Sequence, residues 1–448
     1  MGMIGRQAVV IGAGMGGLTA ARALADFFDQ VVVLERDSLP SQPAARAGIP
    51  QGRHIHALLL GGQRALNELF IGFEHDLAQA GAVRMRAGLD LRAESADYNP
   101  FPQRDLGWHY YAASRPTIEH TVRHRVEGCA NIKLRQRSRV KKLLASPDGE
   151  RVTGVGYENE DGASETIATD FVVDASGTGT LTLDLLQSIG RPMPDETRIG
   201  VDFSYATCVF AIPDDAPTDW KGVRISGGQL PNVRRGGLML PLEGNRWMAG
   251  VGGAHGDVPP GDPEGFLTYA KTLLTPTIYN AISHAKRIGD VARYRFPESI
   301  RRHFERLGTF PAGLLPIADA ICRFNPVYGQ GMSVAAQEAC LLQRLLRSWA
   351  EDSNPIVALA PLFFTEVQTL IETPWAVATL DFVFPETRGQ RPADFENTLR
   401  FGAALTKLAA EDADVHKLTA EVQNLLRPRS AYSDPALVQR VVAMMANA

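Results

Sequence analysis

The sequence predicts an α/β protein in which a Rossmann-type domain carries an inserted antiparallel β-sheet and is followed by C-terminal helices. Three observations lead to this fold. A short apolar strand ended by glycine, a helix and a second apolar strand occupy the first 36 residues. Further strand patterns, one of them a hairpin, occur between residues 170 and 320. From about Ser333 onward helical periodicity dominates.

The N-terminal segment predicts one β-α-β unit. Residues 7–11 (QAVVI) form an apolar run that ends at a glycine, which is typical of a buried parallel strand. Residues 18–27 follow with an apolar stripe at helical spacing, formed by Leu18, Ala21, Leu24 and Ala25. Residues 31–34 (VVVL) make the second buried strand.

The remaining strands come from distant parts of the chain. Residues 170–177 and 314–320 predict two more buried strands that end near the same edge of the first sheet. Between them, residues 202–210 and a hairpin with its turn at residues 243–245 predict an inserted antiparallel sheet. The C-terminal part is expected to be helical, with shorter helices separated by Pro355, Pro361, Pro374 and Pro385.

Composition restricts the kind of partner and the compartment. The chain has 448 residues, 45% of them hydrophobic, and a formal net charge of -4 without a basic stripe, so we expect no nucleic acid partner. Its four cysteines lie far apart without a Cys-x-x-Cys pair, which predicts neither a metal site nor disulfides and favours the cytoplasm. No signal sequence or apolar run of bilayer length is apparent, so we expect no transmembrane segment.

The first motif predicts a dinucleotide site. Gly12, Gly14 and Gly17 stand between the first strand and the first helix, where they permit a tight turn, approach of a pyrophosphate and close packing of the helix on the strand. The helix start then offers free N–H groups to the phosphates. Glu35, at the end of the second strand, is expected to bind an adenosine ribose, and Arg36 beside it is a further candidate cofactor contact.

Two later motifs resemble those of a known family. DASGTGT (residues 174–180) and PIADAICRFNPVYGQGMSVAAQEA (residues 316–339) follow GAGMGG (residues 12–17) along the chain. Together they are similar to the flavoprotein monooxygenases of the para-hydroxybenzoate hydroxylase fold, and more closely to their squalene-epoxidase-like and geranylgeranyl-reductase-like branches. The resemblance covers most of the first 350 residues and implies FAD as the cofactor.

The resemblance also implies a division of the chain. Residues 1–185 would form the first part of an FAD-binding domain and residues 186–289 a substrate-binding β-sheet domain. Residues 290–350 would return to the FAD-binding domain, and residues 351–448 would form a C-terminal helical region.

In that family the aspartate that matches Asp319 binds the ribityl chain of FAD, and Ala318 stands where the family often has glycine. Pro326 would line the flavin ring. The helix that begins near Gly331 would turn its N–H groups toward the ring and stabilise negative charge on reduced flavin. The cofactor contacts expected in this segment are Asp319, Pro326, Gly329, Gln330, Gly331 and Met332.

Other expected cofactor contacts each have a structural alternative. Asp174 and Gly177 end an apolar strand, where the aspartate could instead cap a helix. Arg115 resembles an arginine that the family places near the flavin or the pyrophosphate, although a surface ion pair would explain it as well. Arg53, His54 and His56 match a family loop beside the flavin, and the histidines could equally be hydrogen-bonded core or loop residues.

No acid-base pair is apparent, so the catalytic residues stay open. His56, Tyr205 and Asp381 are the candidates, and for Asp381 a helix end or a surface charge is the alternative. Tyr205, Met239 and Trp247 would floor an apolar substrate chamber, and Trp375, Phe382 and Phe384 would form its lid, unless they are simply core. An apolar chamber suits a flavin C4a-hydroperoxide, which survives where water is excluded.

The expected activity is oxygenation by an FAD-dependent monooxygenase. It would use NADPH or NADH, or a separate flavin reductase, together with O2, to epoxidise or hydroxylate a polyene, a polyketide or a prenylated compound. A reductase of the geranylgeranyl-reductase type would use the same motifs, and a flavin-binding redox protein without turnover is a third possibility. A halogenase is disfavoured because the Trp-x-Trp-x-Ile-Pro segment is missing.

Overall fold

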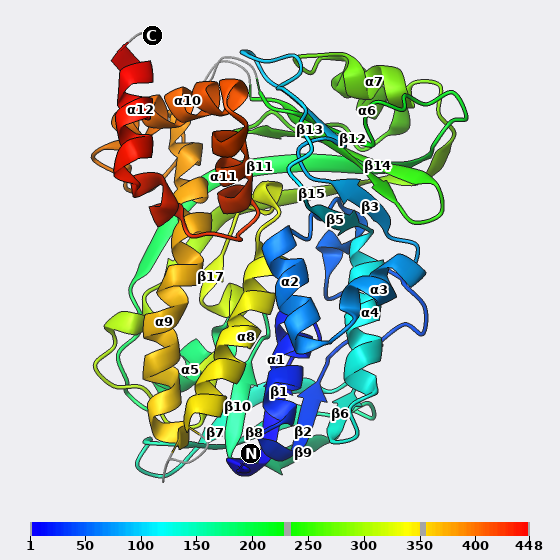
Figure 1. The fold of residues 1–448 in the computed structure, drawn as a ribbon. Helices are drawn as coiled ribbons and strands as arrows, with labels where there is room; N and C mark the ends of the chain where they lie inside the picture. Colours follow the sequence, from blue (N-terminus) through cyan, green and yellow to red (C-terminus); the bar gives the residue numbers. More distant parts are fainter. Residues whose placement is uncertain (1, 228–233, 350–354, 447–448) are drawn as a thin grey trace.

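The computed structural model describes residues 2–227, 234–349 and 355–446. Two sheets dominate it (Figure 1): a five-stranded parallel sheet in the half of the molecule that contains the N-terminus, and a seven-stranded sheet that crosses the other half. The expected α/β fold with an inserted, largely antiparallel sheet and C-terminal helices is confirmed.

The five-stranded sheet is assembled from distant segments, as expected. Its order is β16-β10-β1-β2-β6, and every neighbouring pair is parallel. Val9 and Ile11 enter one hydrophobic core and Ala8 and Val10 the other, so both faces are covered, which explains the continuous apolar runs. The strands are β1 Gly5–Ile11, β2 Phe28–Leu34, β6 Ile132–Arg135, β10 Phe171–Asp174 and β16 Leu314–Pro316.

Helices and a small sheet cover the two faces. The main core, on one face, contains residues of α1 (Met15–Ala25), α2 (Leu60–Leu69), α3 (Phe73–Gln79), α4 (Arg115–Glu127), α8 (Gly331–Trp349) and α9 (Pro355–Ala378). The other face packs on α5 (Thr180–Ser188) and on the antiparallel strands β7 (Arg139–Ala145), β8 (Val152–Glu158) and β9 (Ser164–Ala168).

The seven-stranded sheet has the order β17-β15-β11-β14-β13-β12-β4, antiparallel except for the pair β12 and β4. Its strands are β4 Leu91–Glu94, β11 Glu196–Ala211, β12 Gly222–Ile225, β13 Gly236–Leu242, β14 Arg246–Ala254, β15 Arg287–Arg302 and β17 Cys322–Arg323. The expected hairpin is formed by β13 and β14. One face packs on α6 (Pro263–Lys271) and α7 (Thr277–Ile282), which makes a second core.

The remaining elements are short or C-terminal. A two-stranded sheet pairs β3 (Val83–Arg86) with β5 (His109–Ala112). The last helices, α10 (Phe395–Glu411), α11 (Ala413–Gln423) and α12 (Pro435–Ala446), share a small core of their own. The 3-10 turns are η1 Pro50–Arg53, η2 Phe304–Arg306, η3 Ala318–Ala320, η4 Pro326–Tyr328, η5 Thr379–Val383 and η6 Arg429–Ser433.

The prediction that prolines divide the C-terminal part into shorter helices is wrong for two of them. Pro361 and Pro374 lie inside the 24-residue helix α9. A proline removes one backbone hydrogen bond, but the buried side chains of this helix hold it in the main core beside α8. Burial of the apolar side chains of α9 therefore outweighs the loss of the hydrogen bonds at the two prolines.

One apolar segment, Ile356–Val383, is long and apolar enough to cross a membrane by length and composition alone. Thr365, Glu366, Gln368 and Thr369 interrupt it, which is why the sequence shows no continuous apolar run. Its buried residues, among them Phe363, Phe364, Val367 and Ile371, belong to the main core. The segment thus packs as a core helix of this protein.

The domain division remains a prediction. β15 crosses the boundary expected between residues 289 and 290, and β4 joins the seven-stranded sheet from within the first segment. The boundary at residue 350 lies outside the described residues.

Candidate functional site

The glycine turn between β1 and α1 has the geometry that its spacing predicts. Gly12 has φ +97°, in the left-handed region that favours glycine. A Cβ on Gly17 would lie 1.8 Å from the carbonyl oxygen of Gly12, so only glycine allows this packing of helix on strand. A Cβ on Gly14 would meet only Ile49 Cδ1, at 3.9 Å, so the space in front of Gly14 is open to a ligand.

Glu35 ends β2 directly beside this turn. Its Oε2 accepts the N–H of Ala13 at 2.7 Å, and its Oε1 accepts the N–H of Asp37 at 2.9 Å. The carboxylate therefore fixes the turn, and its contact with a ribose remains a prediction. Arg36 is exposed at the end of the strand, and its cofactor contact also remains a prediction.

Arg46 is a buried site residue that the sequence motifs did not indicate. Its guanidinium lies 3.0 Å from Glu35 Oε2, 3.0 Å from Asp37 Oδ2 and 2.8 Å from Glu119 Oε1. Burial opposes its charge, but the three carboxylates raise the pKa of Arg46 above its usual value. A lone arginine among the small residues of PAARAGIP was the only signal in the sequence.

Arg115 lies near Asp319 of the third motif, because the charge of each influences the pKa of the other. Arg115 begins α4 and forms the ion pair considered as its alternative, with Glu119 at 3.6 Å, but the pair is not at the surface, since the two side chains are 11% and 10% exposed. Burial lowers the pKa of Arg115, and the charges of Glu119 and Asp319 oppose that shift. Burial likewise raises the pKa of Asp319, and Arg323, Arg115 and Arg302 oppose it. The Nε of Arg115 is buried and has no hydrogen-bond partner.

Ala318, where the resembling family often has glycine, adopts φ +54°. Glu338 of α8 stabilises this turn, because its Oε2 accepts the N–H of Ala318 at 2.6 Å. Burial raises the pKa of Glu338 to about 8. The methyl group is therefore tolerated, and Asp319 keeps the position at the turn that the sequence predicts.

The loop before α8 prepares the start of that helix. Asn325 accepts the N–H of Val327 at 3.2 Å and so caps the turn η4. Gly329 has φ +67°, and a Cβ on Gly331 would meet nothing within 4 Å. The Oε1 of Gln330 is buried without a partner. Free space and an unsatisfied acceptor thus lie together at the N-terminus of α8.

Asp381 supports this loop from the first turn of η5, directly after α9 ends, and the interpretation as a surface charge is wrong. It is buried in η5, where its Oδ1 accepts the hydroxyl of Tyr328 at 2.7 Å and its Oδ2 accepts the amide of Asn325 at 3.1 Å. Burial raises the pKa of Asp381 to about 6, and the two donors oppose that shift. The carboxylate holds the loop in place; a catalytic role for it remains a prediction.

Asp174 plays the capping role that was its alternative. Its Oδ1 accepts the N–H and the hydroxyl of Ser176, and its Oδ2 accepts the N–H and the hydroxyl of Thr182 in the first turn of α5. The side chain is fully buried and orders the loop. Gly177 has φ +93° with open space around it, and its cofactor contact remains a prediction.

The segment from residue 50 to residue 59 links the two large sheets. His54 is buried, its Nδ1 lies 2.9 Å from the hydroxyl of Thr207 on β11, and its ring meets Tyr205 edge-on at 4.7 Å. The Nδ1 of His56 lies 2.9 Å from the carbonyl oxygen of His54. Burial lowers the pKa of His54 to about 4 and that of His56 to about 3. Arg53 beside them is exposed.

Most of the aromatic residues expected around a substrate are core. Met239 and Trp247 are buried in the core under α6, on the face of the sheet turned away from His54, so the expectation that they floor a chamber is wrong. Trp375 and Phe382 belong to the main core. Phe384 is half-buried, and its ring meets His255 edge-on at 5.7 Å.

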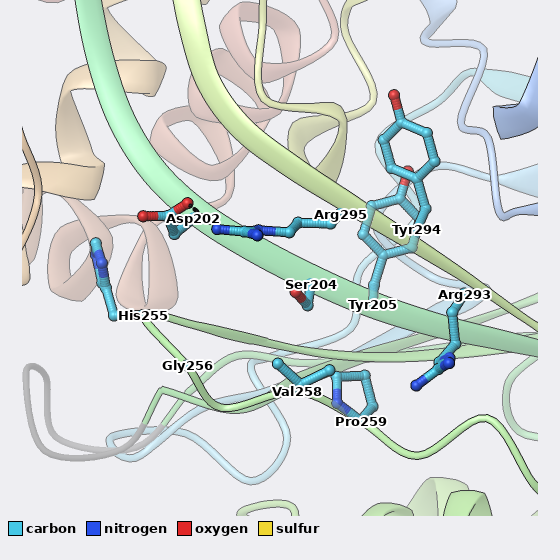
Figure 2. Close-up of a pocket in the computed structure, with 10 residues that line it drawn as sticks. All are labelled: Asp202, Ser204, Tyr205, His255, Gly256, Val258, Pro259, Arg293, Tyr294 and Arg295. Atoms are coloured by element: carbon cyan, nitrogen blue, oxygen red, sulfur yellow. Dashed lines mark hydrogen bonds and ion pairs between the residues drawn. The ribbon is translucent and has the colours of Figure 1, made fainter.

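A cavity of about 540 Å³ lies between β11, β15 and the loop after β14 (Figure 2). Asp202, which lines the cavity, forms two ion pairs: its Oδ1 lies 3.0 Å from Arg295 Nη2, and its Oδ2 lies 2.6 Å from Arg388 Nη1. Tyr294 points to one side of the strands and Arg293 to the other. Tyr205, one of the catalytic candidates, contributes to its lining, and burial raises the pKa of that phenol.

These residues fit an extended FAD. There is open space in front of Gly14 and Gly331, and the two motifs meet where a Cβ on Gly16 would lie 3.0 Å from the Cβ of Ala318. Arg115, whose buried Nε is unpaired, lies near Asp319. Arginine side chains and a helix N-terminus suit a pyrophosphate. The unpaired Oε1 of Gln330, beside the second helix start, could accept an N–H from a flavin ring.

Comparisons with known proteins bear on the family and the fold. The FAD binding domain family matches residues 6–353. Protein Rv3254 of Mycobacterium tuberculosis is 35% identical over 354 residues, which cover 76% of this chain and 73% of that protein. Two solved structures share the fold. The flavin-dependent brominase Bmp2 has a TM-score of 0.68 and 14% identity, with 99% of each chain covered. Pseudomonas aeruginosa PqsL, bound to 2-aminobenzoylacetate, has a TM-score of 0.62 and 15% identity over 85% of this chain and 98% of its own.

Proposed function

Because the chain belongs to the FAD binding domain family, we propose that it is an FAD-dependent monooxygenase that epoxidises or hydroxylates a largely apolar small molecule, such as a polyene, a polyketide or a prenylated compound. The observation that carries this proposal is the convergence of Gly14, Arg115, Asp319 and the start of α8, with unpaired buried polar atoms left between them. The reductant would be NADPH or NADH, or a separate flavin reductase.

The chain's own residues bind and orient the cofactor. When bound and reduced, FAD would supply the electrons that activate O2. Arg115 would hold the pyrophosphate, and Asp319 the ribityl hydroxyls. The first N–H groups of α8 would stabilise negative charge on the ring. Asp381 keeps the loop before α8 in position through Tyr328 and Asn325.

The protonation state of two nearby histidines bears on the alternative activity, reduction of a double bond. A reductase of the geranylgeranyl-reductase type needs an acid that delivers a proton to carbon. Burial keeps His54 and His56 neutral at pH 7, because the pKa values are about 4 and about 3. A reductase would therefore need another acid, for which Tyr205 and Asp381 are the candidates because burial raises the pKa of both.

An isotope experiment tests the proposal. The FAD-loaded protein is incubated with NADPH, an extract of small metabolites and 18O2, and products are analysed by mass spectrometry. We expect a product that carries 18O and that is missing without protein or reductant. Conversion of a metabolite at the same rate under argon, without label, would instead establish a reductase, and oxidation of NADPH without any product would favour a redox protein.

The free thiols favour the cytoplasm as the compartment. Cys208, Cys322 and Cys340 are buried and Cys129 is partly buried, and none is in a disulfide. Reduced cysteines in this number are typical of a reducing compartment. Fractionation of cells that express the protein would place it there.

A further inference from the structure

The two arginines of the cavity in Figure 2 lie on the face of the seven-stranded sheet that is turned away from the FAD-binding part. Arg293 on β15 pairs with Ala206 on β11, and Ala206 is buried in the core that α6 and α7 cover. Arg295, two residues further along the strand, points to the same face. His54 contacts Thr207 on the opposite face. Both arginines therefore point away from the space beside the FAD site.

The loop after β14 lies across the cavity from these strands. Val258 and Pro259 of this loop line the cavity, and Arg293 extends from β15 toward them (Figure 2). The side chain of Arg293 also passes close to Gly261, where a Cβ would lie 2.7 Å from its Nε. The glycine therefore leaves room for the guanidinium between the strand and the loop.

Positive charge is in excess in this cavity. Asp202 is the acidic residue of its lining, and Arg388 from outside the lining pairs with that carboxylate at 2.6 Å. Arg295 also pairs with Asp202, but its side chain is 71% exposed, and such an exposed ion pair contributes little. Within residues 2–227, 234–349 and 355–446, Arg293 forms no ion pair. Two guanidinium groups are therefore available to an anion.

The backbone of the cavity wall is strained. Asp202 has φ +40° and His255 has φ +52°, and the N–H of His255 donates to the carbonyl oxygen of Asp202 at 3.1 Å. Left-handed conformations of residues other than glycine cost about 1 to 3 kcal/mol each and cluster at ligand sites. Gly256 follows with φ +91°, and a Cβ there would meet nothing within 4 Å, so the backbone is open to a ligand.

We propose that this cavity binds a phosphate monoester, which Arg293 and Arg295 contact together with the hydroxyl of Ser204. A phosphate monoester carries about two negative charges at pH 7, which match the two available guanidinium groups, and each group can donate two parallel hydrogen bonds. The cavity volume of about 540 Å³ leaves room for an organic group, and Val258 and Pro259 offer it an apolar surface. The inference goes beyond the proposed function, because the site shares no residue with the FAD contacts.

Binding of 5′-AMP and of adenosine to the FAD-loaded protein tests this assignment by calorimetry. Bound FAD keeps its own adenosine site filled, so the titration reports on other sites. We expect 5′-AMP to bind at least about tenfold more tightly than adenosine, and this preference to decrease as salt is added. Arg293→Gln should weaken the binding of 5′-AMP about tenfold and leave that of adenosine within about twofold.

Arg287→Gln is the matched control. Arg287 begins the same strand β15 but does not line the cavity, so this variant removes an equal charge outside the site and should keep the preference for 5′-AMP. Arg293→Lys keeps the charge without the two-pronged geometry, and about a threefold loss is expected. Arg293 and Arg287 are both exposed, so all three variants should retain FAD and the melting temperature of the natural protein.

NADPH and NADH distinguish two sources of the phosphate. Tighter binding of NADPH, lost in Arg293→Gln, would assign the site to the 2′-phosphate of that reductant. Equal binding of the two dinucleotides, together with the preference for 5′-AMP, would assign it to a free phosphorylated metabolite. Two results would overturn the proposal: 5′-AMP binds no better than adenosine, or Arg293→Gln and Arg287→Gln weaken its binding alike.

Discussion

Gly14 and Gly17 stand three residues apart in one motif, but Gly14 leaves space for a ligand and Gly17 allows the helix to pack on the strand. A methyl group on Gly14 would meet only Ile49 Cδ1 at 3.9 Å, whereas on Gly17 it would lie 1.8 Å from the carbonyl oxygen of Gly12. We therefore expect Gly14→Ala to fold with a free energy of unfolding within about 1 kcal/mol of the natural protein and to bind FAD at least about tenfold more weakly. Gly17→Ala should lose about 3 kcal/mol or more.

Urea unfolding of the FAD-free proteins and flavin titration separate these two effects. If Gly14→Ala bound FAD normally, the pyrophosphate would not approach the backbone at this turn. If Gly17→Ala were as stable as the natural protein, the helix would have shifted away from the strand.

The buried Nε of Arg115 lacks a partner, and this predicts a ligand contact at the residue scale. Arg115→Gln removes the charge that faces Asp319, and we expect FAD affinity to fall on the order of tenfold or more. Arg125→Gln on the same helix α4 is the control, because its ion pair with Asp76 is at the surface, where such pairs contribute little. Equal flavin affinity in the two variants would show that Arg115 is purely structural.

Between elements, Glu338 of α8 supports the turn η3 and makes its stability depend on pH. The folded-state pKa of about 8 lies above the ordinary value of 4.5. From about pH 5 to about pH 8 the folded protein keeps a proton that the unfolded chain has lost, so the free energy of unfolding should fall as the pH rises through this window.

Glu338→Gln keeps an acceptor for the N–H of Ala318 and cannot ionise, so the fall in stability between about pH 5 and about pH 8 should become shallower. Glu372→Gln, at an exposed position on α9, should leave the slope unchanged. Urea unfolding of the FAD-free proteins at several pH values measures both slopes. Identical slopes in the natural protein and Glu338→Gln would mean that Glu338 is ionised in the fold.

Elements also show where prediction from the sequence succeeds. The strands β1, β2, β10 and β16 and the hairpin of β13 and β14 follow from local apolar runs and turn residues, and they are confirmed. The continuity of α9 through Pro361 and Pro374 does not follow, because it depends on packing against residues far away in the sequence. Local patterns determine local conformation, while burial decides whether an unfavourable residue is tolerated.

In the site, residues within one motif were predictable from the sequence, whereas residues that contact the motif from far along the chain were not. Gly12, Gly17 and Glu35 act within a span of 24 residues, and their spacing was sufficient to predict the turn. Asp381 was misjudged because its partners, Asn325 and Tyr328, precede it by 56 and 53 residues. No periodicity links such positions, so only the folded chain identifies that carboxylate as part of the loop's support.

At the scale of the whole molecule, the link between His54 and Thr207 joins the FAD-binding part to the seven-stranded sheet. Thr207→Val keeps the side-chain volume but leaves the buried Nδ1 of His54 without its partner at 2.9 Å. An unsatisfied buried polar group costs about 1 to 3 kcal/mol, and we expect the free energy of unfolding to fall by that amount.

The loss of stability in Thr207→Val should be local to the segment that connects the two sheets. Hydrogen–deuterium exchange should become faster in residues 50–59 and stay unchanged in β1 and β2, because the five-stranded sheet does not depend on this contact. Thr153→Val, at an exposed position on β8, is the control and should alter neither stability nor exchange. Unchanged exchange of residues 50–59 in Thr207→Val would mean that aromatic packing of His54 against Tyr205 is enough to hold the segment that separates the FAD site from the sheet.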